Sequence, residues 1–118
     1  MSGSYSLKGF DIFELSKKLV IACYALTGNL PPEEKTNLTQ YIRNAALSAH
    51  IDIMQGAFLK KKKAKRKLMM SAKNSLVVID AAVDVLIEVG LIKEEDTNEV
   101  MQLSSTCYQL IDRLKKEK

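Results

Sequence analysis

Apolar residues recur at every third or fourth position along most of this chain, the spacing that places side chains on one face of an α-helix. Four stretches carry the pattern, which predicts helices over residues 10–28, 36–58, 64–89 and 94–116. No stretch alternates apolar and polar residues as a half-buried β-strand does. The pattern therefore predicts an all-α fold.

Each predicted helix has a set of apolar residues that we expect to face the core. These sets are Ile12, Leu15, Leu19, Ala22 and Leu26; Leu38, Ile42, Ala45, Ala49, Ile53 and Gly56; Leu68, Ala72, Leu76, Ile79, Val83 and Leu86; and Val100, Leu103, Cys107, Leu110 and Leu114. In the last set the steps of three and four alternate, which is typical of a coiled-coil seam.

Turn residues indicate where the helices end. Gly28 with Asn29 favours a left-handed residue that stops the first helix, and Pro31-Pro32 prevents its continuation. Thr36 or Asn37 is suited to cap the second helix. Gly90 is expected to end the third.

Four amphipathic helices with short connections predict a single domain over residues 1–118, an antiparallel up-down-up-down four-helix bundle. The second predicted helix has small residues at Ala45, Ala46, Ala49 and Gly56, where a neighbour can approach closely. That neighbour is either a helix of the same chain or part of a second subunit, and the sequence leaves both open.

Composition excludes several classes of protein. A chain of 118 residues with five Gly, two Pro and two Cys fits neither a turn-rich β fold nor a disulfide framework. Its start lacks the pattern of a secretory signal. The longest uncharged run has 14 residues, fewer than the roughly 18 that suggest a membrane span. We therefore expect a reduced, cytoplasmic setting without a membrane partner.

The positive charge of the chain is concentrated in one place. Lys and Arg together number 18 and Asp and Glu 14, and seven of the cations fall in the eight residues 60–67. The rest of the chain has 11 cations and 14 anions, so its balance is −3. This basic segment consists of Lys60, Lys61, Lys62, Lys63, Lys65, Arg66 and Lys67.

The basic segment is expected to bind a polyanion. The segment falls where the second predicted helix ends and the third begins. Cations that close the second helix suit its dipole, whereas cations that open the third, as we expect for Lys65, Arg66 and Lys67, oppose it. The seven cations also repel one another, so solubility alone does not explain their density. Contacts with several phosphates release counterions and give a salt-sensitive affinity. The segment holds no aromatic residue for base stacking, so we expect contacts with the phosphate backbone of RNA or DNA. Arg43 and the C-terminal Arg113, Lys115, Lys116 and Lys118 extend the expected surface. An acidic protein surface and a merely solvated helix end remain alternatives.

Candidate catalytic residues are few. His50 is the only histidine, and Cys23 and Cys107 lie on or beside apolar faces, where free cysteines are usually buried. A nucleophile needs a base and a group that orients that base. Neither a glycine-rich phosphate loop nor a Ser-centred elbow is present. We expect a protein that is not an enzyme.

Asp80, Asp84 and Glu88 form an acidic row at four-residue spacing. Such a row can attract a divalent cation, but it is more often solvated or paired with Lys or Arg of a neighbouring helix or subunit. We expect no resident metal and no cofactor. A metal-dependent enzyme that uses His50, Cys23 or this row is a rival interpretation.

Several short motifs are spread between residues 10 and 116. They are Leu30-Pro31-Pro32-Glu33-Glu34, Leu38-Thr39, Ile42-Arg43, Ala45-Ala46 with Ser48, Gly56, Lys63, Ser75-Leu76 and Gly90-Leu91-Ile92. Together they resemble the bacterial four-helix-bundle family of 23S rRNA intervening-sequence proteins.

The chain also departs from that family's pattern. It has Asp52-Ile53-Met54-Gln55-Gly56 where the common pattern reads Asn-Ile-Ala-Glu-Gly, and His50 stands where a proline is usual. The segment between the second and third helices is richer in lysine. A degenerate polar motif with a stronger basic segment is similar to one branch, the accessory variability determinants of diversity-generating retroelements.

The resemblance to this branch implies a function. Its members look like basic four-helix bundles assembled as homopentameric rings, which act as non-catalytic partners of a reverse transcriptase and contact its RNA or DNA. For this chain it implies a nucleic-acid-binding accessory protein and a ring-shaped homo-oligomer with a pentamer as the expected size. A structural or protein-interaction bundle without nucleic-acid binding is the alternative.

Overall fold

The computed structural model describes the backbone of residues 7–117 and the side chains of residues 11–114. In that part of the chain there are four α-helices, two short 3-10 helices and no strand. In chain order the elements are α1 (Leu7–Thr27), the 3-10 helix η2 (Pro32–Glu34), α2 (Leu38–Ala57), α3 (Lys62–Glu88), the 3-10 helix η3 (Glu94–Thr97) and α4 (Asn98–Glu117). The expected all-α fold is confirmed over these residues.

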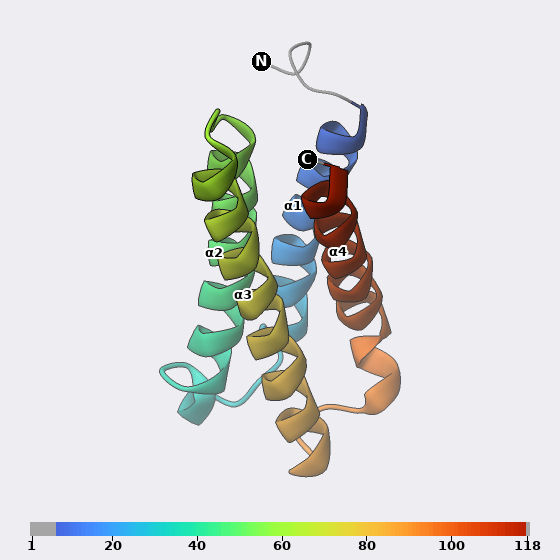
Figure 1. The fold of residues 1–118 in the computed structure, drawn as a ribbon. Coiled ribbons are helices and arrows are strands. Elements are labelled where there is room, and N and C mark those ends of the chain that lie inside the picture. The colour runs from blue at the N-terminus through green and yellow to red at the C-terminus, as the bar shows by residue number, and fades with distance from the viewer. Residues whose placement is uncertain (1–6, 118) are drawn as a thin grey trace.

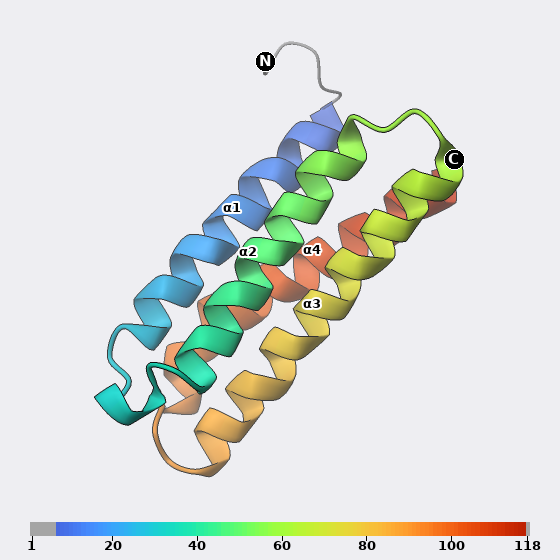
Figure 2. The same ribbon diagram turned by 90° about the vertical axis from the view of Figure 1, so that its left-hand side faces the viewer.

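The four α-helices lie side by side in an elongated body of 43 × 22 × 22 Å (Figure 1). The connection between α2 and α3 lies at one end of this body, which we call the α2–α3 end (Figure 2). The other two connections lie at the opposite end (Figure 2). α2 packs mainly on α3 and also on α1, while α4 packs on α1 and α3.

Apolar side chains from all four α-helices form one core. The largest fully buried ones are Ile12, Leu19 and Cys23 of α1, Ile42 and Ile53 of α2, Leu76, Ile79, Val83 and Leu86 of α3, and Val100, Cys107 and Ile111 of α4. Burying one large aliphatic side chain contributes roughly 1.5–3 kcal/mol relative to leaving it exposed. The helical pattern of the sequence therefore translates directly into the main source of stability.

The small residues of α2 are buried inside this chain. Ala46 and Ala49 are fully buried and Ala45 nearly so. At Gly56 an added Cβ would lie 2.7 Å from Met69 Cε of α3, so α3 approaches closely there. Of the two alternatives left open by the sequence, packing within the chain is the one observed.

The buried side of α4 agrees with the expected seam at Val100 and Cys107 and differs from it by one residue at two other positions. Ser104 and Ile111 are buried, whereas Leu103 and Leu110 are only partly buried. Steps of three and four have the same mean period in either order, so the sequence pattern permitted both phases. Ser104 donates a hydrogen bond to Asp80 Oδ1 of α3 at 3.0 Å, which satisfies its hydroxyl inside the helix contact.

The expectation of a left-handed Gly28 is wrong. Its N–H donates to the Tyr24 carbonyl at 3.0 Å, as in a continuing helix. Among the described glycines only Gly90 has a positive φ. The chain turns after α1 because the Leu30 N–H bonds to the Thr27 carbonyl at 3.1 Å and two prolines follow.

Gly90 follows α3 in the left-handed region, with φ 79°. Its N–H donates to the Ile87 carbonyl and the Leu91 N–H to the Leu86 carbonyl, both at 3.0 Å. This pair of bonds is the Schellman motif, which favours glycine because a side chain is strained at positive φ.

The start of α2 is capped by a residue other than the expected one. Asn37 occupies the N-cap position, but its side chain does not cap the helix. Instead Glu34 Oε1 accepts the Leu38 N–H at 3.4 Å and the Asn37 side-chain amide at 3.2 Å. A carboxylate from the preceding 3-10 turn thus takes the role predicted for Asn37 or Thr36, and its charge also suits the helix dipole.

Candidate nucleic-acid interface

The basic segment spans the connection from α2 to α3 and the first turns of α3. Lys60 and Lys61 lie in the connection, because α2 ends at Ala57 and α3 begins at Lys62. The other five cations lie within the first six residues of α3. The helix therefore starts two residues before the expected residue 64 and contains five of the seven cations of the basic segment.

The cations of this segment face water. All are exposed except Lys65, which is partly buried. Among the described residues, no carboxylate forms an ion pair with Lys60, Lys61, Lys63, Lys65, Arg66 or Lys67. Their charge is thus available to a ligand without an internal ion pair having to be broken.

The start of α3 adds its own positive field. Lys61 is the N-cap residue and makes no side-chain cap, and no acidic residue lies in the first turn. The first N–H groups of a helix have no partner within it, and the dipole places partial positive charge there. A phosphate group near this turn would meet both the cations and these N–H groups.

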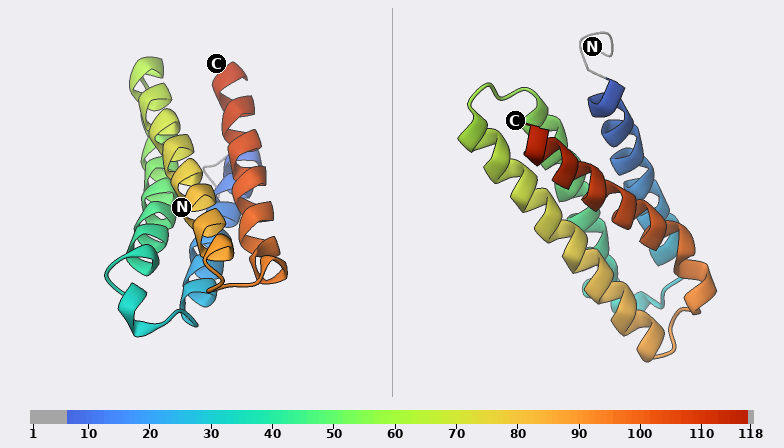
Figure 3. Two further views of the ribbon diagram at one scale, coloured as in Figure 1. Left: turned by 90° about the horizontal axis from the view of Figure 1, so that it is seen from below. Right: turned by 45° about the vertical axis from the view of Figure 1, so that its right-hand side comes forward.

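The C-terminal end of α4 lies at the same end of the body as the basic segment (Figures 1 and 3). Arg113 is exposed on it. The side chains of Lys115 and Lys116, and Lys118 as a whole, lie outside the described residues. The structure thus brings Arg113 to the α2–α3 end.

Arg43 is not brought together with the basic segment. It lies near the start of α2, about 25 Å from Lys60 by the helical rise. Its Nε donates to Thr27 Oγ1 at 2.8 Å, and Nη2 donates to the Tyr24 carbonyl at 3.3 Å. The guanidinium also lies 4.3 Å from the centre of the Tyr24 ring. These contacts fasten α2 to the C-terminal end of α1.

Phe58 borders the basic segment and was missed by sequence reasoning. It follows the last residue of α2, and its side chain is 55% exposed. An aromatic ring beside exposed cations is the combination on which bases of single strands stack. The signal in the sequence was its position off the buried stripe of α2, two residues before Lys60.

His50 pairs with a buried serine. Its Nδ1 lies 2.6 Å from Ser16 Oγ, which also donates to the Phe13 carbonyl at 3.2 Å. Burial lowers the pKa of His50, Lys17 lowers it further, and Glu14 opposes the shift. Although a hydroxyl next to an imidazole is an arrangement used by nucleophiles, Ser16 is only 1% exposed, so a substrate cannot reach it.

Both cysteines are free and buried. Burial raises the pKa of the Cys23 thiol to about 12 and that of Cys107 to about 11. A thiol that stays protonated at neutral pH is a poor nucleophile and a poor metal ligand.

The acidic row is divided between two environments. Asp80 accepts the hydrogen bond from Ser104, and its partial burial raises its pKa. Asp84 and Glu88 are exposed. Within the described residues, no group of three or more His, Cys, Asp or Glu side chains is arranged to hold a metal ion.

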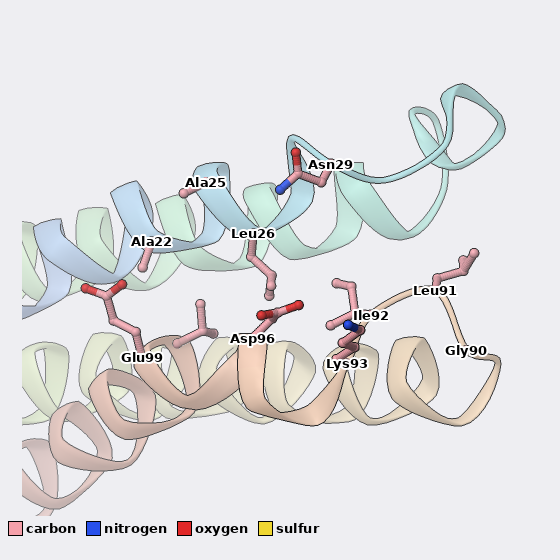
Figure 4. A pocket seen from close by; sticks show the side chains of 11 residues that line it. Ala22, Ala25, Leu26, Asn29, Gly90, Leu91, Ile92, Lys93, Asp96 and Glu99 are labelled. Atoms are coloured by element: carbon pink, nitrogen blue, oxygen red, sulfur yellow. The ribbon is translucent and has the colours of Figure 1, made fainter.

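An open pocket of about 660 Å³ lies between α1 and the α3–α4 connection, at the end of the body away from the basic segment (Figure 4). Its charged lining residues are Lys93, Asp96 and Glu99, and the rest of the wall is largely apolar. Neither histidine nor cysteine lines it. The pocket and the basic segment are thus separate features.

No helix in the described part of the chain is long and apolar enough to span a bilayer. Compared with known families, residues 8–113 match the sequence profile of the 23S rRNA-intervening sequence protein family. No curated protein matches the chain.

Proposed function

Because the chain belongs to the 23S rRNA-intervening sequence protein family, we propose that it is a non-catalytic accessory protein that binds nucleic acid through the basic segment. The observation that carries this proposal is that six cations of the basic segment have no ion-pair partner among the described residues: Lys60, Lys61, Lys63, Lys65, Arg66 and Lys67. The family name supports an RNA partner. The proposed setting is the bacterial cytoplasm.

Phosphate contacts supply the affinity. Each lysine or arginine that neutralises a phosphate releases condensed counterions, so affinity falls steeply as salt rises. Such contacts position the protein but do not read sequence. We therefore expect binding to RNA and DNA with little base preference, apart from any stacking that Phe58 adds.

The proposed assembly is an antiparallel four-helix bundle that forms a homo-oligomeric ring. The ring of five and a reverse transcriptase as protein partner are implied by the resemblance to the accessory variability determinants. The outward face of α2 supports self-association, because Leu47 and Ile51 lie along it and are each 42% exposed. A ring would present several basic segments to one polyanion and raise the avidity.

The experiment is fluorescence anisotropy with labelled RNA and DNA over a salt series. If five cations contact duplex DNA, the slope of log affinity against log salt is about −4.5, which is a loss of roughly 500-fold between about 50 and 200 mM salt. Replacing all seven cations by Gln should flatten this slope and leave the circular dichroism spectrum unchanged.

A matched pair of variants tests the location. K60Q/K61Q/R66Q and K18Q/K35Q/K93Q each remove three exposed cations, the first set from the basic segment and the second from elsewhere. Only the first should reduce the salt slope, by about three. Equal losses in both would show non-specific attraction, and no binding by the wild type at about 50 mM salt would contradict the proposal.

The second candidate function is a bundle that binds protein alone. The exposed apolar residues of α2 favour it, because such side chains suit a protein partner. It predicts a partner whose binding survives nuclease and high salt. In that case the seven-cation variant would retain the partner.

A further inference from the structure

The outward side of α3 carries a regular seam. Eight exposed residues follow one another at alternating steps of four and three: Lys63, Lys67, Met70, Asn74, Val77, Ala81, Asp84 and Glu88. These steps align side chains along one side of a helix, as in two helices that pack in a coiled coil. The buried residues of α3, such as Leu76 and Val83, lie on the side that faces the chain's own core.

The two ends of this α3 seam have opposite charge. Lys63 and Lys67 lie near its start, and Asp84 and Glu88 near its end. None of these four forms an ion pair within the described residues. The four positions between them are uncharged.

This distribution is unfavourable for a single chain. Cations stand at the positive end of the helix dipole and anions at the negative end, the reverse of the favourable order. Lys63 and Lys67 are also a like-charge pair four residues apart, and so are Asp84 and Glu88, which destabilises a helix further. A partner that presents the opposite charge at each end would offset both effects.

The pattern is its own complement. Charged and uncharged positions are symmetric about the midpoint between Ser75 and Leu76, with the sign of charge reversed. We propose that two copies of this chain associate through the α3 seam, with their α3 helices antiparallel. Lys63 then faces Glu88 of the partner subunit, and Lys67 faces the partner's Asp84. A parallel arrangement would place like charges opposite each other at both ends.

The middle of the seam supplies apolar contact. Met70 is 42% and Val77 52% exposed, and Val85 beside the seam is 47% exposed. The seam is about 37 Å long by the helical rise, and the body is 43 Å long. A contact along nearly the whole body would remove these side chains from water.

This contact goes beyond the proposed function and divides the basic segment. Lys63 and Lys67 turn to the second copy, while Lys60, Lys61 and Arg66 remain free for phosphates. A two-fold contact closes on itself as a pair, so a ring would need a different face of the chain.

Charge reversal tests the proposal. The mass of the assembly is measured by light scattering on nuclease-treated protein. The absorbance spectrum of the sample verifies that no nucleic acid remains. K63E/K67E and D84K/E88K should each halve the mass of the wild type, whereas K63E/K67E/D84K/E88K restores complementary charges and should restore the mass. The control K60E/K61E reverses two cations outside the seam and should leave the mass unchanged.

Loss of folding does not mimic the expected result, because each reversal improves the match to the helix dipole. Circular dichroism of each variant verifies this. An unchanged mass in K63E/K67E, or a quadruple variant that stays dissociated, overturns the proposal. If nuclease alone dissociates the wild type, nucleic acid and not a second copy holds the chains together, and the proposal is equally overturned.

Discussion

The two ends of the helical body both carry basic side chains, but their surroundings differ. At the end where α1 is connected to α2, Arg43 donates hydrogen bonds to Thr27 and Tyr24 and lies over the Tyr24 ring. At the α2–α3 end, Lys60 and Lys61 are exposed and have no ion-pair partner among the described residues.

The difference shows why the number of charges does not define a binding surface. A cation that already donates two hydrogen bonds and lies over an aromatic ring must give up those contacts before it binds a phosphate. A solvated lysine gives up only water. Arg43 therefore stabilises the fold, and the proposed ligand surface is limited to the α2–α3 end.

The largest expected difference between the two ends is in stability. Arg43→Gln removes hydrogen bonds from a charged donor, and for this half-buried group we expect the free energy of unfolding to fall by about 1–2 kcal/mol. Lys61→Gln should change it by less than about 0.5 kcal/mol. Urea unfolding measures both.

Binding should show the reverse order. Lys61→Gln is expected to reduce the salt slope by about one, and Arg43→Gln to leave it unchanged. If Arg43→Gln weakens binding as much as Lys61→Gln without loss of stability, the assignment of Arg43 to the fold is wrong.

A smaller effect should appear when Lys61 is replaced by Asp. Lys61 has the extended backbone of an N-cap residue, φ −76° and ψ 126°, but provides no side-chain cap. An Asp there can accept an N–H of the first turn, which adds about 1 kcal/mol of stability. Stability should rise while nucleic-acid affinity falls.

The control for these opposite changes in stability and affinity is Lys61→Ala, which loses the positive charge without adding a cap. It should lower affinity and leave stability nearly unchanged. A fall of both quantities in Lys61→Asp would mean that the basic segment supports the fold and is not kept for a ligand.

Much of the fold could be predicted from the sequence, because apolar residues at helical spacing form one face of each helix and that face packs on the core. The third set of apolar residues illustrates this: all but its first, Leu68, are buried. In α4 the prediction is confirmed at Val100 and Cys107, but Ser104 is buried more deeply than the expected Leu103. That choice depends on Asp80 of another helix, which no local pattern contains.

The candidate site was predictable only in part. A dense run of lysines is visible in the sequence, but whether a carboxylate of the chain lies close enough to pair with one of them depends on the tertiary arrangement. The sequence shows the charge of Arg43 but not its hydrogen bond to Thr27, because Thr27 lies 16 residues earlier in the chain. Phe58 lies off the buried stripe of α2 in the sequence, but the exposure of its ring is known only from the structure.

His50 sharpens the comparison, since it lies two turns after Arg43 on α2 but in surroundings that disfavour charge. Its pKa is lowered below the ordinary 6.5, first by burial and then by Lys17. The folded state therefore binds fewer protons than the unfolded state, so stability is full above that pH and falls as the pH drops below it. Urea unfolding between about pH 7 and pH 5 should show this slope. His50→Gln, which keeps a partner for Ser16, should flatten the slope, and an equal slope in the variant would exclude His50 as its source.

The smallest expected effect concerns two cations of α3. Lys73 donates a hydrogen bond to Asp112 and lies 4.6 Å from the Tyr108 ring, whereas Arg66 has no ion pair within the described residues. The hydrogen bond to Asp112 raises the pKa of Lys73, so its contribution to stability is present below the ordinary 10.5 and is lost as the pH rises through the folded-state pKa. At neutral pH, Lys73→Gln should lower the melting temperature slightly, and Arg66→Gln should not. Because exposed pairs are screened by solvent and salt, the difference should shrink at high salt. If both variants melt like the wild type, a partner within the chain does not by itself make a cation structural. The burial of Arg43, and not its hydrogen bonds alone, would then account for the contrast between the two ends.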